Sequence, residues 1–131
     1  DAREKHAAWE GQADVVMADV PCSGLGIIRK KPDIRYKNPK ELAQLPLVQR
    51  AILENASGYV RPGGTLVYST CTVLPEENED VTGDFLDKHP EFEPVRTAFP
   101  LPVGPCPGQV TLWPQRHGTD GFYICRMRRK D

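Results

Sequence analysis

The sequence predicts an α/β protein in which helices cover the faces of a sheet. Two short runs, residues 13–20 and 65–69, are apolar almost throughout, as is typical of strands buried on both faces of a parallel sheet. A segment with helix-like spacing of its apolar residues follows each run. This alternation of strand and helix indicates an α/β sheet with helices on its faces.

After the first strand, residues 13–20, the next predicted element is a helix over residues 47–59. Leucine, isoleucine and valine recur there at near-helical spacing. Asn38 is a suitable first residue for this pattern, but Pro46 interrupts it. We therefore expect either a kink or two separate helical pieces.

A second strand is predicted over residues 65–69, directly after a Pro-Gly-Gly turn at residues 62–64. A second helix is expected to begin near Pro75, because proline suits the first turn of a helix and the acidic residues that follow complement the positive end of its dipole. His89, which precedes a proline, marks the end of this helix.

The last third of the chain gives weaker signals. Residues 91–95 are a candidate third strand, and residues 121–128 alternate enough to form a final strand. The density of prolines between residues 97 and 108 predicts a surface loop without regular structure. We assign no role to this proline-rich loop or to its thiol, Cys106.

Composition limits the classes of function. The 17 Lys+Arg and 18 Asp+Glu residues give a net charge of −1, which neither requires nor excludes a nucleic-acid partner, although basic residues gather between Arg29 and Lys40. The four cysteines show neither a CxxC pair nor zinc-ligand spacing, which argues against a structural metal. With no secretory signal segment and no apolar run near the roughly 20 residues of a membrane span, we expect a soluble, cytoplasmic protein.

Chemically useful side chains follow both predicted strands. Asp19 and Cys22 come after the first strand, and Cys71 comes after the second. Because the carboxyl ends of parallel strands meet at one edge of a sheet, we expect these residues to be neighbours in space. A thiol near a helix N-terminus can serve as a nucleophile, whereas the alternative for each cysteine is a small buried apolar residue.

Four motifs together resemble one enzyme family. The segments DVPCSGLG, IRKKPDIRY, LVYSTCTVLPEEN and DGFYICRMRR occur in this order over nearly the whole chain. They are similar to the RsmB/Sun (Fmu) branch of the S-adenosylmethionine-dependent RNA cytosine-5 methyltransferases. The resemblance implies the C-terminal half of a Rossmann-like class I methyltransferase sheet, with the glycine-rich cofactor loop and any N-terminal RNA-binding domain outside residues 1–131.

The resemblance also implies roles for individual residues. Cys71 matches the family's nucleophile, which adds to C6 of a cytosine in RNA. The substrate RNA that the resemblance implies is small-subunit (16S) ribosomal RNA. Cys22 matches the cysteine that assists product release. Asp19 matches the acid that contacts both the base and S-adenosylmethionine, and Asp1 matches an acid near the adenosine part of that cofactor. The basic side chains placed to hold RNA phosphates are Arg29, Lys30 and Arg35.

Two other functions stay open at this stage. One is a catalytically silent RNA-binding fragment, and the other is a cysteine-dependent hydrolase that would use His117 as its base. If residues 1–131 are half of a methyltransferase sheet, we expect this fragment to be inactive alone. Because one apolar sheet edge would be exposed, copies of the fragment should associate with one another or fold only weakly.

Overall fold

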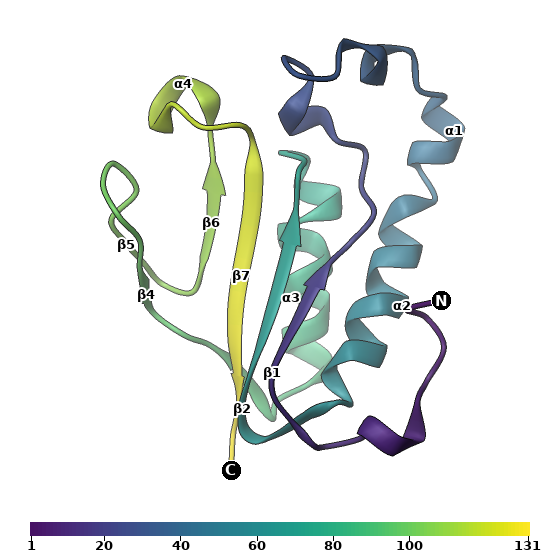
Figure 1. Ribbon diagram of the computed structural model, residues 1–131, viewed down its shortest axis with the longest axis vertical. Helices are drawn as coiled ribbons and strands as arrows, with labels where there is room; N and C mark the ends of the chain where they lie inside the picture. The colour runs from purple at the N-terminus through teal and green to yellow at the C-terminus, as the bar shows by residue number, and fades with distance from the viewer.

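The computed structural model describes residues 1–131 and is built on a five-stranded mixed sheet (Figure 1). The strands follow the order β1-β2-β7-β3, and β6 pairs with the remaining length of β7. β1 and β2 are parallel, whereas β7 is antiparallel to its three neighbours. The strand bounds are β1 (Ala13–Asp19), β2 (Val60–Thr70), β3 (Phe92–Pro94), β6 (Gln109–Leu112) and β7 (Phe122–Arg129).

Two helices connect β1 to β2, as the interrupted pattern predicted. α1 (Pro39–Leu42) is capped by Asn38, whose side chain accepts the backbone N–H of Lys40 at 3.0 Å. After a short break, α2 (Leu45–Ser57) begins with Pro46 in its first turn, where the missing proline N–H costs no helical hydrogen bond. The expectation of two helical pieces is therefore confirmed.

The second long helix, α3 (Glu79–Lys88), packs beside α2. A single turn of 3-10 helix, η4 (Pro75–Glu77), precedes it. The guanidinium of Arg50 on α2 donates two hydrogen bonds to the carboxylate of Asp84 on α3, at 3.0 and 2.8 Å. No helix of the protein has both the length and the apolar character needed to cross a bilayer.

The hydrophobic core fills the space between these two helices and one face of the sheet. Burial of this apolar surface is the main stabilising contribution to the fold. The fully buried members of the core are Leu53, Val60, Leu66, Tyr68, Val81, Tyr123, Cys125 and Met127.

The predicted α/β class is confirmed. The prediction that helices cover both faces is not, because α2 and α3 lie on the same face of the sheet. Alternate side chains of β1 point to opposite faces. Ala18 faces the core, whereas Val15 and Met17 are 64% and 67% exposed. β1 also pairs only with β2 and leaves its other edge free. These exposed features are what self-association through the sheet would require, and self-association stays a prediction.

The Pro-Gly-Gly segment lies inside β2 and not before it. The ladder with β1 starts at Ala13 and Val60, then shifts so that Val15 pairs with Thr65. The extra residues form a bulge in which Gly63 has a φ of 74°, a left-handed conformation that favours glycine. The predicted strand of residues 65–69 was too short, because the buried Val60 on the far side of the bulge already pairs.

The prediction of a loop without regular structure at residues 97–108 was partly wrong. β4 (Thr97–Ala98) pairs with β5 (Pro105–Cys106) in a short antiparallel ladder. Pro105 is tolerated because an edge strand need not use every backbone N–H. The strand β6 and the short helix α4 (Pro114–His117) that follows it were not predicted at all.

His89 links both long helices to the edge of the sheet. Its Nε2 lies 2.8 Å from a carboxylate oxygen of Glu54 on α2, and its Nδ1 lies 2.9 Å from a carboxylate oxygen of Glu91 beside β3. The imidazole also stacks on Phe85, with ring centroids 4.3 Å apart. Burial lowers the pKa of His89, but hydrogen bonds to Glu91 and Glu54 outweigh burial, and the net pKa is raised above its ordinary value.

We expect this link to weaken as the pH rises. Because the folded-state pKa of His89 exceeds the unfolded value of about 6.5, its stabilising contribution is complete below about pH 6.5 and is lost as the pH passes through the folded-state pKa. Both glutamates are largely exposed, so the contribution should not exceed about 1 kcal/mol. Urea unfolding of the wild type and His89→Gln between pH 5.5 and 8.5 measures it. If the difference in unfolding free energy between the wild type and His89→Gln did not shrink as the pH rises, this expectation would be contradicted.

Candidate active site

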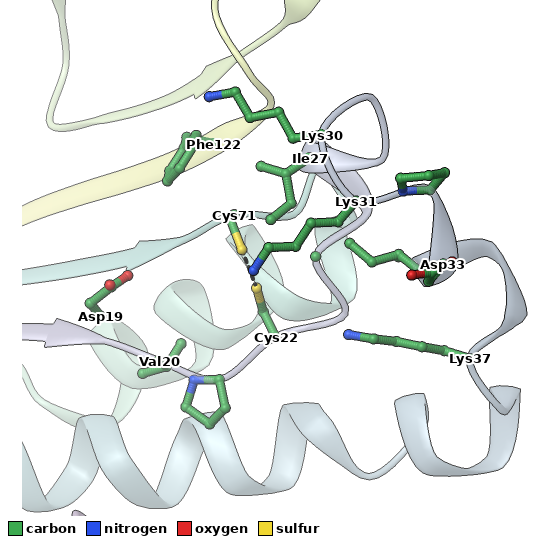
Figure 2. Close-up of a pocket in the computed structure, with 14 residues that line it drawn as sticks. Asp19, Val20, Cys22, Ile27, Lys30, Lys31, Asp33, Lys37, Cys71 and Phe122 are labelled. Atoms are coloured by element: carbon green, nitrogen blue, oxygen red, sulfur yellow. Dashed lines mark hydrogen bonds between the residues drawn. The ribbon is translucent and has the colours of Figure 1, made fainter.

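The two cysteine loops meet at the carboxyl edge of the parallel pair. β1 and β2 are in register at Asp19 and Ser69, so the loops that leave these strands begin side by side. The Sγ atoms of Cys22 and Cys71 lie 3.2 Å apart, within hydrogen-bond distance for sulfur (Figure 2). The predicted proximity of the two loops is thus observed. It follows from strand pairing, because the two thiols lie far apart in the sequence.

The thiol of Cys22 is held in its protonated form. Burial raises the pKa of the Cys22 thiol to about 12, and the hydrogen bond with Cys71 acts in the same direction. Cys22 therefore keeps its proton at neutral pH. Either sulfur can be the donor in the contact between the two thiols.

A buried carboxylate fixes the loop that carries Cys22. The side chain of Glu77 accepts the backbone N–H of Ser23 at 2.8 Å and the Ser23 hydroxyl at 2.5 Å. It also accepts Nε2–H of Gln49 on α2 at 2.9 Å, and the same nitrogen donates to the carbonyl of Pro21 at 3.0 Å. Glu77 therefore joins the loop after β1 to α2 and to η4.

Asn78 fixes the loop that carries Cys71 in a similar way. Its amide oxygen accepts the Thr70 hydroxyl at 2.6 Å, and its amide nitrogen donates to the carbonyl of Thr72 at 3.0 Å. The sequence analysis placed Glu77 and Asn78 at a helix start and at the end of the LVYSTCTVLPEEN motif, but it assigned them no role of their own. Their position a few residues after Cys71 was a signal that they could fold back onto its loop.

Two glycines from separate motifs bring a third segment into the site. Gly26 donates its N–H to the carbonyl of Cys71 at 3.0 Å, and Gly121 donates its N–H to the carbonyl of Gly26 at 2.7 Å. A Cβ at Gly26 would lie only 1.9 Å from the carbonyl oxygen of Gly121. The motifs around Cys22, around Cys71 and before β7 therefore share one junction that is made by backbone atoms.

A cavity of about 730 Å³ opens beside the thiols and is called the cysteine cavity below. Figure 2 shows the two sulfurs at its centre and the side chain of Lys31 reaching toward them. No histidine lines this cavity, and the Nδ1 of His117 accepts the backbone N–H of Trp113 at 2.9 Å. The residues named at sequence level that line the cysteine cavity are Asp19, Cys22, Lys30 and Cys71.

A second cavity of about 410 Å³ adjoins the first and is called the apolar cavity below. Asp19 lines both cavities, and its carboxylate accepts the hydroxyl of Ser69 at 2.9 Å. Asp1, whose carboxylate pairs with Arg3, lines the apolar cavity as well. The walls are formed largely by Trp9, Val16, Met17, Ala18, Ile52, Ala56 and Tyr59. Apolar walls with carboxylates at the rim fit the flat ring and the hydroxyl groups of an adenosine.

The three basic residues expected to hold phosphates differ in their surroundings. Asp120, in the loop before β7, pairs with Lys30 at 2.5 Å and with Arg29 at 3.4 Å. The hydrogen bond from Lys30 is the main reason why the pKa of Asp120 is lowered. Arg35 is exposed and donates only to the carbonyl of Pro32, at 3.4 Å. The pairing of Asp120 with these two cations was not predicted from the sequence.

Comparison with known proteins gives one consistent result. Residues 1–128 match the family described as 16S rRNA methyltransferase RsmB/F. The probable ribosomal RNA small subunit methyltransferase B of Bacillus subtilis is 44% identical to the chain, and the alignment covers 99% of the chain and 31% of that protein. The chain thus spans about three tenths of the length of such relatives.

Solved structures agree with this match. The crystal structure of PH0851 superimposes with a TM-score of 0.86 at 36% identity, over 98% of this chain and 30% of that one. NSun6 from Pyrococcus horikoshii, solved with SFG, gives a TM-score of 0.71 at 26% identity, over 100% of this chain and 33% of that one. The sheet described above therefore has the Rossmann-like fold of these methyltransferase neighbours, and its place as the C-terminal half of such a sheet stays a prediction.

We expect Gly26→Ala to destabilise the protein by about 1–3 kcal/mol, because the added methyl group forces apart two hydrogen-bonded backbones. Urea denaturation measures the loss. Gly83→Ala is the matched control, since nothing lies within 4 Å of the added atom on α3, and it should stabilise the helix by about 0.5–1 kcal/mol. If Gly26→Ala were as stable as the wild type, the contact between the backbones of Gly26 and Gly121 would not be as close as described.

Proposed function

The chain belongs to the 16S rRNA methyltransferase RsmB/F family, and on that premise we propose that it transfers a methyl group from S-adenosylmethionine to C5 of a cytosine in small-subunit ribosomal RNA. The observation that carries the proposal is the pair of thiols, 3.2 Å apart, in a cavity that shares Asp19 with the adjoining apolar cavity. The curated relatives are much longer than residues 1–131, so the proposal concerns the activity of a protein of their length.

Carbon 5 of cytosine is a weak nucleophile and needs activation. In the proposed reaction the thiolate of Cys71 adds to C6, which forms a C–S bond and makes C5 electron-rich. Asp19 lies on the rim of the same cavity, where it can bond to the base edge and offset the charge that develops on the ring. Addition by a cysteine agrees with a cavity that holds two thiols and no histidine.

Product release reverses the addition. The proton on C5 passes to a base or to water, the C5–C6 double bond re-forms, and the C–S bond breaks to return the thiolate of Cys71. The raised pKa of Cys22 keeps its proton available, so its S–H can stabilise the departing sulfur. The assignment of attack to Cys71 and release to Cys22 follows the family resemblance, and the 3.2 Å contact is short enough for Cys22 to act on the sulfur of Cys71.

The apolar cavity suits the adenosine part of the methyl donor. S-adenosylmethionine would supply the methyl group as an electrophile. Asp1 and Asp19 would accept hydrogen bonds from its polar groups, and the apolar walls would cover its ring. The structure of the NSun6 relative with SFG, an S-adenosylmethionine analogue, supports this choice of cofactor.

Covalent trapping tests the cysteine roles. RNA that carries 5-azacytosine, incubated with the full-length protein and S-adenosylmethionine, should form an adduct that survives denaturing electrophoresis. We expect Cys71→Ala to abolish the adduct, because the C–S bond can no longer form, and Cys22→Ala to keep or increase it. Cys106→Ala, a thiol outside both cavities, is the control and should behave as wild type. No adduct with any variant would contradict the proposal.

Salt dependence of RNA binding tests the basic residues. If Arg29 and Lys30 contact phosphates, replacing both with glutamine should weaken binding and reduce the slope of log K against log salt by about one unit per lost contact. Asp120→Asn frees the same two cations from their carboxylate and should strengthen binding. Equal slopes for the wild type and the double variant would exclude these contacts.

A further inference from the structure

The carboxyl group of Glu77 is buried among neutral hydrogen-bond donors. Only 2% of the residue is exposed, and its carboxylate contacts Ser23 and Gln49 but no lysine or arginine. The neighbouring Gln49 also leaves its Oε1 buried without a hydrogen-bond partner. Burying a charge and an unpaired amide oxygen costs free energy that an apolar cluster of the same shape would avoid. If the polar cluster only connected these loops, an apolar cluster of the same shape would do so at a lower free-energy cost.

Proton directions in this cluster follow from the carboxylate. An ionised Glu77 has no proton to give, so the Ser23 hydroxyl must donate to it across the 2.5 Å contact. The Ser23 oxygen then accepts the hydroxyl proton of Thr72, 2.8 Å away. One carboxylate thus sets the orientation of both hydroxyl groups.

These hydroxyl groups stand next to the two thiols in the sequence. Ser23 follows Cys22, and Thr72 follows Cys71, so the loops contact each other twice in succession. One contact joins the sulfurs at 3.2 Å and the other joins the hydroxyl oxygens at 2.8 Å. A shift of Ser23 would therefore move the sulfur of Cys22 relative to that of Cys71.

We propose that Glu77 is a positioning residue for product release, which it controls through Ser23 by holding the thiol of Cys22 on the sulfur of Cys71. This inference rests on the proposed methyltransferase function. Glu77 touches neither cavity, and its effect on the reaction passes through the Ser23 backbone and hydroxyl.

The informative substitution is Glu77→Gln, which keeps the size of the side chain but replaces one acceptor oxygen with an NH2 group. If the NH2 group takes the place of Oε1, the backbone N–H of Ser23 and the side-chain amide of Gln49 both face a donor; if it takes the place of Oε2, the Ser23 hydroxyl faces a donor. In either orientation Ser23 can no longer donate both of its hydrogen bonds to residue 77. Cys22 should lose its alignment, whereas Cys71, held by the backbone of Gly26 and by Asn78 through its neighbours, should stay in place.

The test uses the full-length protein, S-adenosylmethionine and ordinary, unmodified RNA. We expect Glu77→Gln to accumulate a covalent protein–RNA adduct, with multiple-turnover methylation about 10–100-fold slower and the first turnover nearly unchanged. A merely structural role would lower the unfolding temperature without accumulating adduct. Glu76→Gln removes a carboxyl group from an exposed neighbour whose side chain makes no hydrogen bond or ion pair, and it should match the wild type.

Ser23→Ala provides a second route to the same conclusion, including the case in which Glu77→Gln fails to fold. If Glu77 acts through Ser23, Ser23→Ala alone should accumulate adduct, and the double variant should be no slower than the slower single variant. Additive losses in the double variant would overturn the inference about Glu77. So would the absence of adduct with both variants when Cys22→Ala does accumulate it, and in both cases the proposed function would stand. Absence of adduct with Cys22→Ala as well would overturn the release step of the proposed function.

Discussion

Parallel pairing of β1 with β2 is the constraint on which the rest of the molecule depends. A parallel pair cannot close through a tight turn, so the chain must leave β1, cross one face of the sheet as α2 and return. That crossover supplies the core-facing side of α2. The same pairing aligns Asp19 with Ser69 and therefore starts both cysteine loops at one edge. Fold and site are consequences of one strand register.

Polar groups, rather than apolar ones, shape the region beyond those strand ends. The core ends near Tyr68, whose hydroxyl donates to the carbonyl of Glu77 at 2.6 Å, and further along the loops the buried contacts are hydrogen bonds. Such bonds are directional, whereas apolar packing tolerates small shifts. Two thiols held 3.2 Å apart in a fixed orientation need the directional kind of support. This division explains why buried serine, threonine, asparagine and glutamate side chains concentrate in one part of a small protein.

Sequence periodicity was sufficient for β1, α2, α3 and β7, because each carries its own apolar pattern and its own start or stop signal. It failed for β6, whose alternation of Gln109 and Thr111 with apolar residues has meaning only once β7 lies beside it. The site divides in the same way. Strand ends predicted that Cys22 and Cys71 would meet, but the roles of Glu77 and Asp120 depend on partners distant in the sequence, which no local pattern contains.

The junction of Gly26 and Gly121 implies an unusual kind of evolutionary coupling. When two side chains clash, a smaller residue at one position usually rescues a larger residue at the other. Here both partners are already the smallest residue, and the contact is between their backbones. A larger residue at either position leaves nothing at the other position to reduce. The pair should therefore be recognisable by its lack of compensating changes.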